Sequence, residues 1–183
     1  MHESFVFSGF GGQGVMFVGQ LLAYAAMDVG LEVTWIPSYG PEMRGGTAHC
    51  FVVISDHPIG SPLVSRPKTA IVFNNPSFQK YEPIVESGGL LASNASLIAA
   101  ASQRTDITFA PIPATAIADE LGAMKIANLV MLGGVLTVHP VLSLDALKHA
   151  LDEHIPPHRR SLLDLNFAAV DRGAEYVTSQ VLA

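Results

Sequence analysis

The chain has 183 residues, enough for a sizeable core, and we expect residues 1–183 to form a single domain. Only 14% of the residues are charged, against about 25% in an average soluble domain, so we expect another chain to cover part of the surface. The net charge of −6 is spread along the sequence without a basic run, which argues against binding of nucleic acid or of an anionic membrane.

A single cysteine, Cys50, limits the redox chemistry of the chain. It cannot form an internal disulfide, and an iron–sulfur cluster needs about four thiolates. The first residues lack the basic and apolar regions of a signal peptide, and the longest nearly uncharged stretch, residues 126–139, is shorter than the roughly 20 residues of a membrane span. We therefore expect a cytoplasmic chain without a metal site of its own.

The start of the sequence predicts a strand, a helix and a second strand. Residues 4–8 form a short, β-favouring apolar run, and residues 15–29 have helical spacing up to Gly30, a natural helix stop. Residues 31–37 predict the next strand. Together these segments predict a βαβ unit.

The rest of the chain alternates strands with helices. Four further strands are expected, at residues 47–54, 69–73, 89–93 and 107–110. Weaker helical patterns occupy residues 77–86, 114–121 and 125–138, and two C-terminal helices follow, one capped by Ser143 and one over residues 159–182. The pattern predicts an α/β fold: a three-layer, Rossmann-like domain with a mostly parallel sheet and a helical C-terminal end.

A glycine loop joins the first predicted strand to the first helix. Its residues are Gly9, Phe10, Gly11, Gly12, Gln13 and Gly14, which fit the pattern G-x-G-x-x-G in the context that this pattern requires. Glycines permit positive φ, and a helix N-terminus presents unpaired N–H groups to an anion. The loop either meets a phosphate or carboxylate, or it is a tight turn that lets the helix pack on the sheet.

Two nucleotide-binding alternatives fit this loop less well. A Walker A loop needs Lys and Ser or Thr after its last glycine, where this chain has Val15 and Met16. A nicotinamide site needs an acidic residue at the end of the second strand, but Glu32 lies at its start. A free-standing NAD(P)-binding oxidoreductase therefore stays as the alternative hypothesis.

A second loop, dense in turn formers, follows the second strand. It consists of Ser38, Tyr39, Gly40, Pro41, Glu42, Met43, Arg44, Gly45 and Gly46. In a parallel sheet it emerges at the same end as the glycine loop. Arg44 could bind an anion there, or it could form a local ion pair with Glu42 that shapes the loop.

The two loops carry a family resemblance. GFGGQGV at residues 9–15, SYGPEMRGG at residues 38–46 and the strand that ends at Asp56 resemble the gamma subunits of pyruvate, ketoisovalerate and 2-oxoglutarate ferredoxin oxidoreductases. Residues 125–133 and 166–173 are similar to that family too, so the resemblance covers nearly the whole chain. At Lys68 the sequence departs from the family, where we expect an acidic residue.

The resemblance implies a subunit of a larger enzyme. Such a complex oxidatively decarboxylates a 2-oxoacid with coenzyme A, giving acyl-CoA, CO₂ and reduced ferredoxin. The resemblance places thiamine diphosphate, Mg²⁺ and the iron–sulfur clusters in alpha-, beta- and delta-type partner subunits, so this chain alone is expected to be inactive and to contain no catalytic residue. We expect its two loops to lie near the coenzyme A path or a subunit interface; a purely structural scaffold is the remaining alternative.

One polar residue stands out in the later helices. Asn128 lies among apolar residues of a predicted helix, where its amide needs a partner in a neighbouring loop or subunit. We expect a structural role for it. His49 and Cys50 are adjacent in a predicted strand and therefore point to opposite faces, which argues against a thiolate–imidazole pair.

Overall fold

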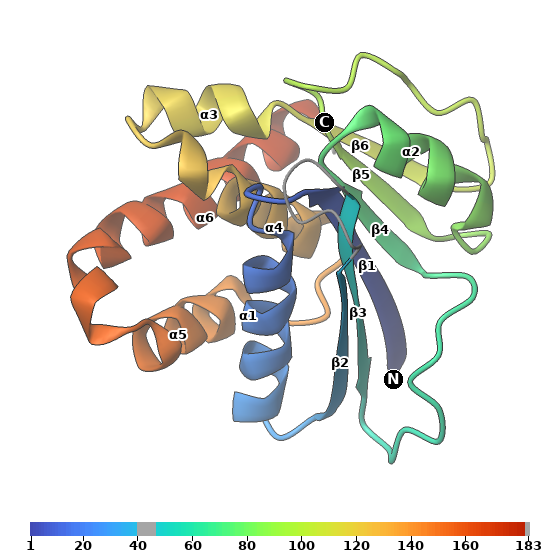
Figure 1. Ribbon diagram of the computed structural model, residues 1–183, viewed down its shortest axis with the longest axis horizontal. Helices are drawn as coiled ribbons and strands as arrows, with labels where there is room; N and C mark the ends of the chain where they lie inside the picture. Colours follow the sequence, from blue (N-terminus) through green and yellow to red (C-terminus); the bar gives the residue numbers. More distant parts are fainter. Residues whose placement is uncertain (40–46, 182–183) are drawn as a thin grey trace.

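The computed structural model describes residues 1–39 and 47–181, in which a six-stranded sheet lies between two unequal layers of helices (Figure 1). The strands are β1 (His2–Phe10), β2 (Glu32–Tyr39), β3 (Thr47–Ser55), β4 (Thr69–Val72), β5 (Leu90–Asn94) and β6 (Thr108–Ile112). Their order across the sheet is β2-β3-β1-β4-β5-β6. The four strands β1, β4, β5 and β6 are parallel to one another, so the predicted α/β fold with a mostly parallel sheet is confirmed.

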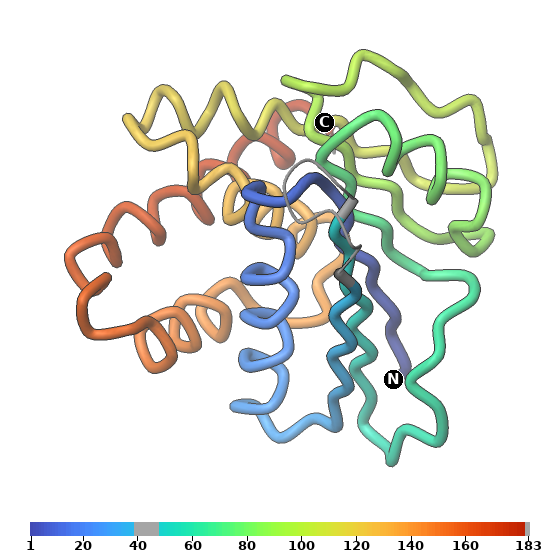
Figure 2. Tube along the Cα trace, viewed as in Figure 1, coloured from blue at the N-terminus to red at the C-terminus, as the bar shows by residue number. Residues whose placement is uncertain are grey.

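Strand β3 is the exception to the parallel arrangement. It runs antiparallel to β1 on one side and to β2 on the other. Because β1 and β2 therefore point the same way, the predicted βαβ unit is present, but β3 lies between its two strands. Five strands thus end at one end of the sheet, which we call the carboxyl end, and begin at the other, the amino end. Figure 2 follows the chain from its N-terminus at the amino end to the turn after β1 at the carboxyl end.

The helices are distributed unequally over the two faces (Figure 1). The larger layer contains α1 (Val15–Asp28), α3 (Ala114–Glu120), α4 (Ala127–Val138), α5 (Leu144–His154) and α6 (Leu163–Gln180), with the short 3₁₀ helices η2 (Met124–Ile126) and η3 (Pro157–Leu162). The opposite face carries α2 (Asn75–Tyr81) and the 3₁₀ helix η1 (Glu82–Ile84). The hydroxyl of Ser143 accepts a hydrogen bond from the Ala146 N–H at 3.1 Å, as expected of the residue that caps α5.

Alternation along the strands divides the core between these faces. On β1, Phe5 and Phe7 pack under the larger helical layer, whereas Val6 packs under α2, and all three are fully buried. Helix α4 is buried along most of its length because α6 crosses its outer side. At the crossing, a Cβ on Gly173 would collide with the Val130 carbonyl oxygen, so only glycine allows this close approach. Over the described ranges, no helix is long and apolar enough to cross a membrane.

Candidate functional site: the carboxyl end of the sheet

The glycine loop turns tightly between β1 and α1. The Gln13 N–H donates to the Phe10 carbonyl at 3.2 Å, which closes a turn directly after the strand. Gly12 and Gly14 have φ values of 99° and 74°, a region that side chains with a Cβ rarely adopt. The backbone geometry therefore requires glycine at both positions.

The Gln13 side chain ties this turn to the neighbouring strand. Its Oε1 accepts a hydrogen bond from the Phe10 N–H at 2.6 Å, and its Nε2 donates to the Phe73 carbonyl at 3.1 Å, just beyond β4. A Cβ on Gly9 would lie 2.6 Å from Gln13 Oε1, so the glycine at position 9 makes room for this bridge. The Gln13 amide is thus used within the protein and holds the shape of the loop.

Asn128 forms a hydrogen bond with the other end of the glycine loop. It is 4% exposed, and its Nδ2 donates to the Gly14 carbonyl at 3.1 Å while its Oδ1 accepts from the Leu129 N–H at 2.9 Å. A Cβ on Gly14 would overlap the Asn128 amide. Residues 114 positions apart therefore fix the start of α1 against the start of α4.

Within residues 1–39 and 47–181, no side chain caps the first turn of α1. Its N-cap is Gly14, which offers no side-chain acceptor, and no acidic residue lies in the first turn. The partial positive charge of this helix N-terminus therefore lies beside the glycine loop without an acidic residue in the first turn. Such an arrangement can hold an anion or a polarised oxygen, although by itself it supplies neither an acid, a base nor a nucleophile.

A hollow of about 190 Å³ adjoins the loop on the side of β4 and β5. Its wall is formed by Gly12, Gln13, Phe73, Asn94, Leu97, Thr115, Met124, Lys125 and Ala127. The sequence patterns did not single out Lys125, Asn94 or Thr115 as site residues. For Lys125 a signal existed, because it is the only Lys or Arg between Arg104 and Lys148.

The second loop is only partly described. Ser38, at the end of β2, pairs with His49 on β3, and Tyr39 and Gly9 both pair with Ala48. The two loops thus leave the sheet at the same end, with β3 between their strands. The remaining predicted residues of this loop, Gly40, Pro41, Glu42, Arg44, Gly45 and Gly46, lie outside the described residues.

His49 and Cys50 point to opposite faces, as their adjacency predicts. Cys50 is fully buried under α1, where burial raises the pKa of its thiol to about 12, and its Sγ donates to the Val15 carbonyl at 3.5 Å. His49 lies near the rings of Phe51 and Tyr81, and its pKa is lowered by burial and by the nearby Lys80 charge. The cysteine is therefore a protonated core residue and does not act as a thiolate.

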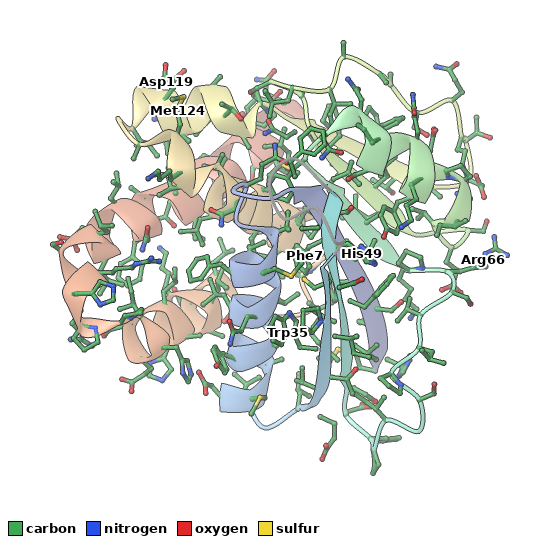
Figure 3. All side chains as sticks on the ribbon, viewed as in Figure 1. Phe7, Trp35, His49, Arg66, Asp119 and Met124 are labelled. Carbon is green, nitrogen blue, oxygen red and sulfur yellow. The ribbon has the colours of Figure 1, made fainter. Side chains whose placement is uncertain are left out.

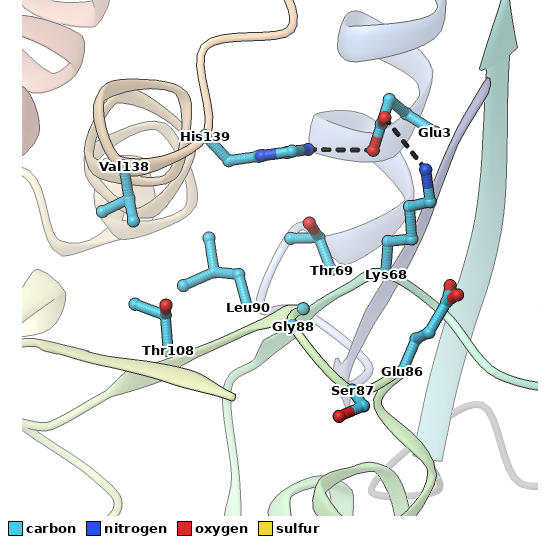
Figure 4. A pocket seen from close by; sticks show the side chains of 11 residues that line it. Glu3, Lys68, Thr69, Glu86, Ser87, Gly88, Leu90, Thr108, Val138 and His139 are labelled. Atoms are coloured by element: carbon cyan, nitrogen blue, oxygen red, sulfur yellow. Dashed lines mark hydrogen bonds and ion pairs between the residues drawn. The ribbon is translucent and has the colours of Figure 1, made fainter. Parts of the chain in front are cut away.

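The amino end of the sheet holds a second hollow, of about 390 Å³ (Figure 4). In it the Glu3 carboxylate lies between two basic side chains. His139 Nε2 is 2.9 Å from one carboxylate oxygen, and Lys68 Nζ is 3.1 Å from the other. Lys68 also donates to the His2 carbonyl at 2.6 Å. The lysine that departs from the family pattern is therefore part of an ion cluster that joins β1, the start of β4 and the end of α4.

Comparison with known proteins places this geometry in a family. The family model described as "Pyruvate ferredoxin/flavodoxin oxidoreductase" matches residues 4–176. The 2-oxoglutarate synthase subunit KorC of Methanocaldococcus jannaschii is 32% identical, over 96% of this chain and 94% of the relative. The gamma subunit of a keto/oxoacid ferredoxin oxidoreductase from Geobacter sulfurreducens has a solved structure with a TM-score of 0.86 and 25% identity, covering 98% of both chains.

A longer relative shares the same region. The ketoisovalerate oxidoreductase subunit VorA of Methanothermobacter marburgensis is 34% identical over 92% of this chain, which spans only 35% of the length of VorA. These matches confirm the family resemblance of the chain. The chain belongs to the pyruvate ferredoxin/flavodoxin oxidoreductase family.

Proposed function

We propose that this chain is the gamma-type subunit of a cytoplasmic 2-oxoacid:ferredoxin oxidoreductase. The complex would oxidatively decarboxylate 2-oxoglutarate, pyruvate or a branched-chain 2-oxoacid with coenzyme A, giving acyl-CoA, CO₂ and reduced ferredoxin. The main support is the similarity to KorC and to the Geobacter gamma subunit, because the match covers more than nine tenths of the length of each. A free-standing NAD(P) enzyme is not favoured, because Glu32 pairs with Ser55 at the amino end, away from the glycine loop.

The redox centres of the proposed complex belong to its alpha-, beta- and delta-type subunits. The one cysteine of this chain is buried and protonated, so its residues do not fit an iron–sulfur cluster. Among the residues that the structure describes, no group of three or more His, Cys, Asp or Glu side chains could hold a metal ion. Thiamine diphosphate with Mg²⁺, held by partners, would supply the carbanion chemistry of decarboxylation, and this chain would supply surface and orientation.

We assign the two loops to the coenzyme A path or to the alpha-type interface beside it. Three features support this assignment. Both loops leave the sheet at its carboxyl end, and the start of α1 has no side-chain cap. Lys125 adds a cation to the hollow beside the glycine loop. Ligands of open α/β sheets characteristically bind at this end. A pure scaffold is the competing function, and kinetics separate the two.

Anaerobic purification of the tagged chain from its host tests the proposal. Thiamine- and cluster-bearing subunits should elute with it, together with coenzyme A-dependent reduction of a dye by a 2-oxoacid, and the best substrate identifies the oxoacid. Turnover by the pure chain, or elution without other subunits, would contradict the proposal.

A glycine substitution then tests the assignment of the loop. Gly12→Ala should raise the KM for coenzyme A about fivefold, because it strains the loop by roughly 1 kcal/mol. Gly30→Ala is the matched control, since Gly30 also has positive φ (84°) and open space around it but lies after α1, far from the loop. Equal kinetics for the two variants would favour the scaffold.

A further inference from the structure

A groove runs along the outer side of α1, next to the glycine loop, and it adjoins the hollow beside β4 and β5 at Lys125, which lines both. It consists of two hollows of about 360 and 190 Å³ that share Phe17, Ile155, Pro156 and Arg159. Helix α1 forms one wall, from Gly14 to Tyr24, and the turn from α5 into η3 forms the other. We call this surface the α1 groove.

The α1 groove exposes large apolar side chains. Phe17 is 37% exposed and Leu162 is 45% exposed, on opposite walls of the groove. A monomeric protein seldom leaves such side chains grouped in a concave surface. Their grouping indicates that something apolar covers them.

A polar side chain also lines the larger hollow of the α1 groove. Asn166, on the first turn of α6, is only 7% exposed and lines the larger hollow. No hydrogen bond links its side chain to another residue of the described ranges, and its amide is not among the fully enclosed polar groups without a partner, so it faces the groove. Such an amide can bond to water or to a polar group of whatever occupies the groove.

The charges at the rim are also uncompensated. Arg159 and Lys125 line the groove, and neither lies within 4 Å of a carboxylate of residues 1–39 or 47–181. The adjacent Arg160, by contrast, pairs with Asp152 at 3.0 Å. In a chain with a net charge of −6, two cations without acidic neighbours are complementary to an acid supplied from outside.

We propose that the α1 groove seats a segment of a partner subunit that carries apolar side chains and at least one Asp or Glu. The inference rests on the proposed function, because the partner is another subunit of the same complex. The apolar side chains lie over Phe17 and Leu162, the carboxylate pairs with Arg159, and a polar group of the segment bonds to Asn166.

Two other occupants fit less well. A bare anion would satisfy Arg159 but would leave the exposed apolar side chains uncovered. A second copy of this chain, related by a twofold axis through the groove, would bring the same lining against itself, and that lining contains no Asp or Glu to pair with Arg159 or Lys125.

Photo-crosslinking of the assembled complex tests this proposal. A photoreactive phenylalanine analogue at position 17 should crosslink to a partner peptide that contains Asp or Glu. The matched control is the same analogue at position 63, since Leu63 is 84% exposed on the loop between β3 and β4. Crosslinks from position 17 to no subunit of an active complex, or to a peptide without an acidic residue, would overturn the proposal while leaving the proposed function intact.

Charge reversal provides the second test. Arg159→Glu should weaken assembly at least about tenfold, measured as subunit dissociation over a salt series, whereas Arg159→Lys should restore most of it. Arg66→Glu is the matched control, because Arg66 is exposed and lies on the other side of the sheet from Met124 (Figure 3). Equal dissociation of the Arg159→Glu and Arg66→Glu complexes would overturn the inference. If the wild-type chain itself forms no complex, the proposed function is overturned as well.

Discussion

The two ends of the sheet differ in whether their charged side chains are paired within the chain. At the amino end, Glu3 has both Lys68 and His139, and Arg104 binds Asp106 through two hydrogen bonds of 2.9 and 2.6 Å. At the carboxyl end and in the adjacent α1 groove, the helix start is uncapped and Lys125 and Arg159 have no acid among the described residues. The amino end thus satisfies these charges within the fold, whereas the carboxyl end leaves its cations available, as the proposed contact with a ligand or partner subunit requires.

The largest effect is expected from the glycine that meets Asn128. Gly14→Ala should lower the free energy of unfolding by about 3 kcal/mol, because positive-φ strain adds to displacement of the Asn128 hydrogen bond. Gly12→Ala should cost only about 1 kcal/mol, since nothing lies within 4 Å of its Cβ. Urea unfolding of the two variants gives the comparison.

A double variant identifies the source of that difference. In an Asn128→Ala background, Gly14→Ala should cost no more than Gly12→Ala, because the overlapping amide is gone. If Gly14→Ala and Gly12→Ala cost the same in the wild-type background, the Asn128 contact contributes nothing to the rigidity of the carboxyl end.

A moderate effect is expected at the amino end. Glu3→Gln should lower the free energy of unfolding by about 1–2 kcal/mol, because Lys68 and His139 lose the carboxylate between them. Glu86→Gln is the control: Glu86 is exposed in the same hollow and has no ion-pair partner among the described residues, so its replacement should change little. If thermal melting shows the same loss of stability for Glu86→Gln and Glu3→Gln, the ion pairs of Glu3 contribute nothing specific and the contrast between the two ends disappears.

The smallest effect concerns pH. The hydrogen bonds from Arg104 are the main reason that the pKa of Asp106 falls to about 2, below the roughly 3.9 of a free aspartate. A depressed folded-state pKa gives stability that is present above pH 3.9 and lost as the pH falls towards 2. Asp106→Asn should therefore flatten the acid limb of the unfolding curve in that window, and an unchanged limb would show that the pair is screened by solvent.

Most elements of the fold follow from local patterns in the sequence. The apolar run of β1, the Gly30 stop and the Ser143 cap are sufficient to place their elements. The same patterns did not predict the antiparallel direction of β3, although the sequence contains an indication of it. Only seven residues separate β2 from β3, too few for the crossover that parallel neighbours need.

The candidate site was less accessible to sequence reasoning. Glycine spacing located the loop, because that constraint is local, but of the three glycines that fit the pattern (Gly9, Gly11 and Gly14) only Gly14 has positive φ, and the second positive-φ position is Gly12. The Gln13 bridge to Phe73 and the Asn128 contact with Gly14 join residues 60 and 114 positions apart, and one sequence carries no record of such pairings. The α1 groove was missed for the same reason, since its walls come from the two halves of the chain.

The carbonyl of Gly14 accepts hydrogen bonds both from the Val18 N–H at 3.1 Å and from Asn128. One oxygen atom thus couples the first turn of α1 to a helix buried in the core. The loop is therefore preorganised: little conformational entropy remains for a ligand or partner to remove when it binds. Association at this end should consequently resemble the docking of rigid surfaces, with the adaptation left to the incoming molecule.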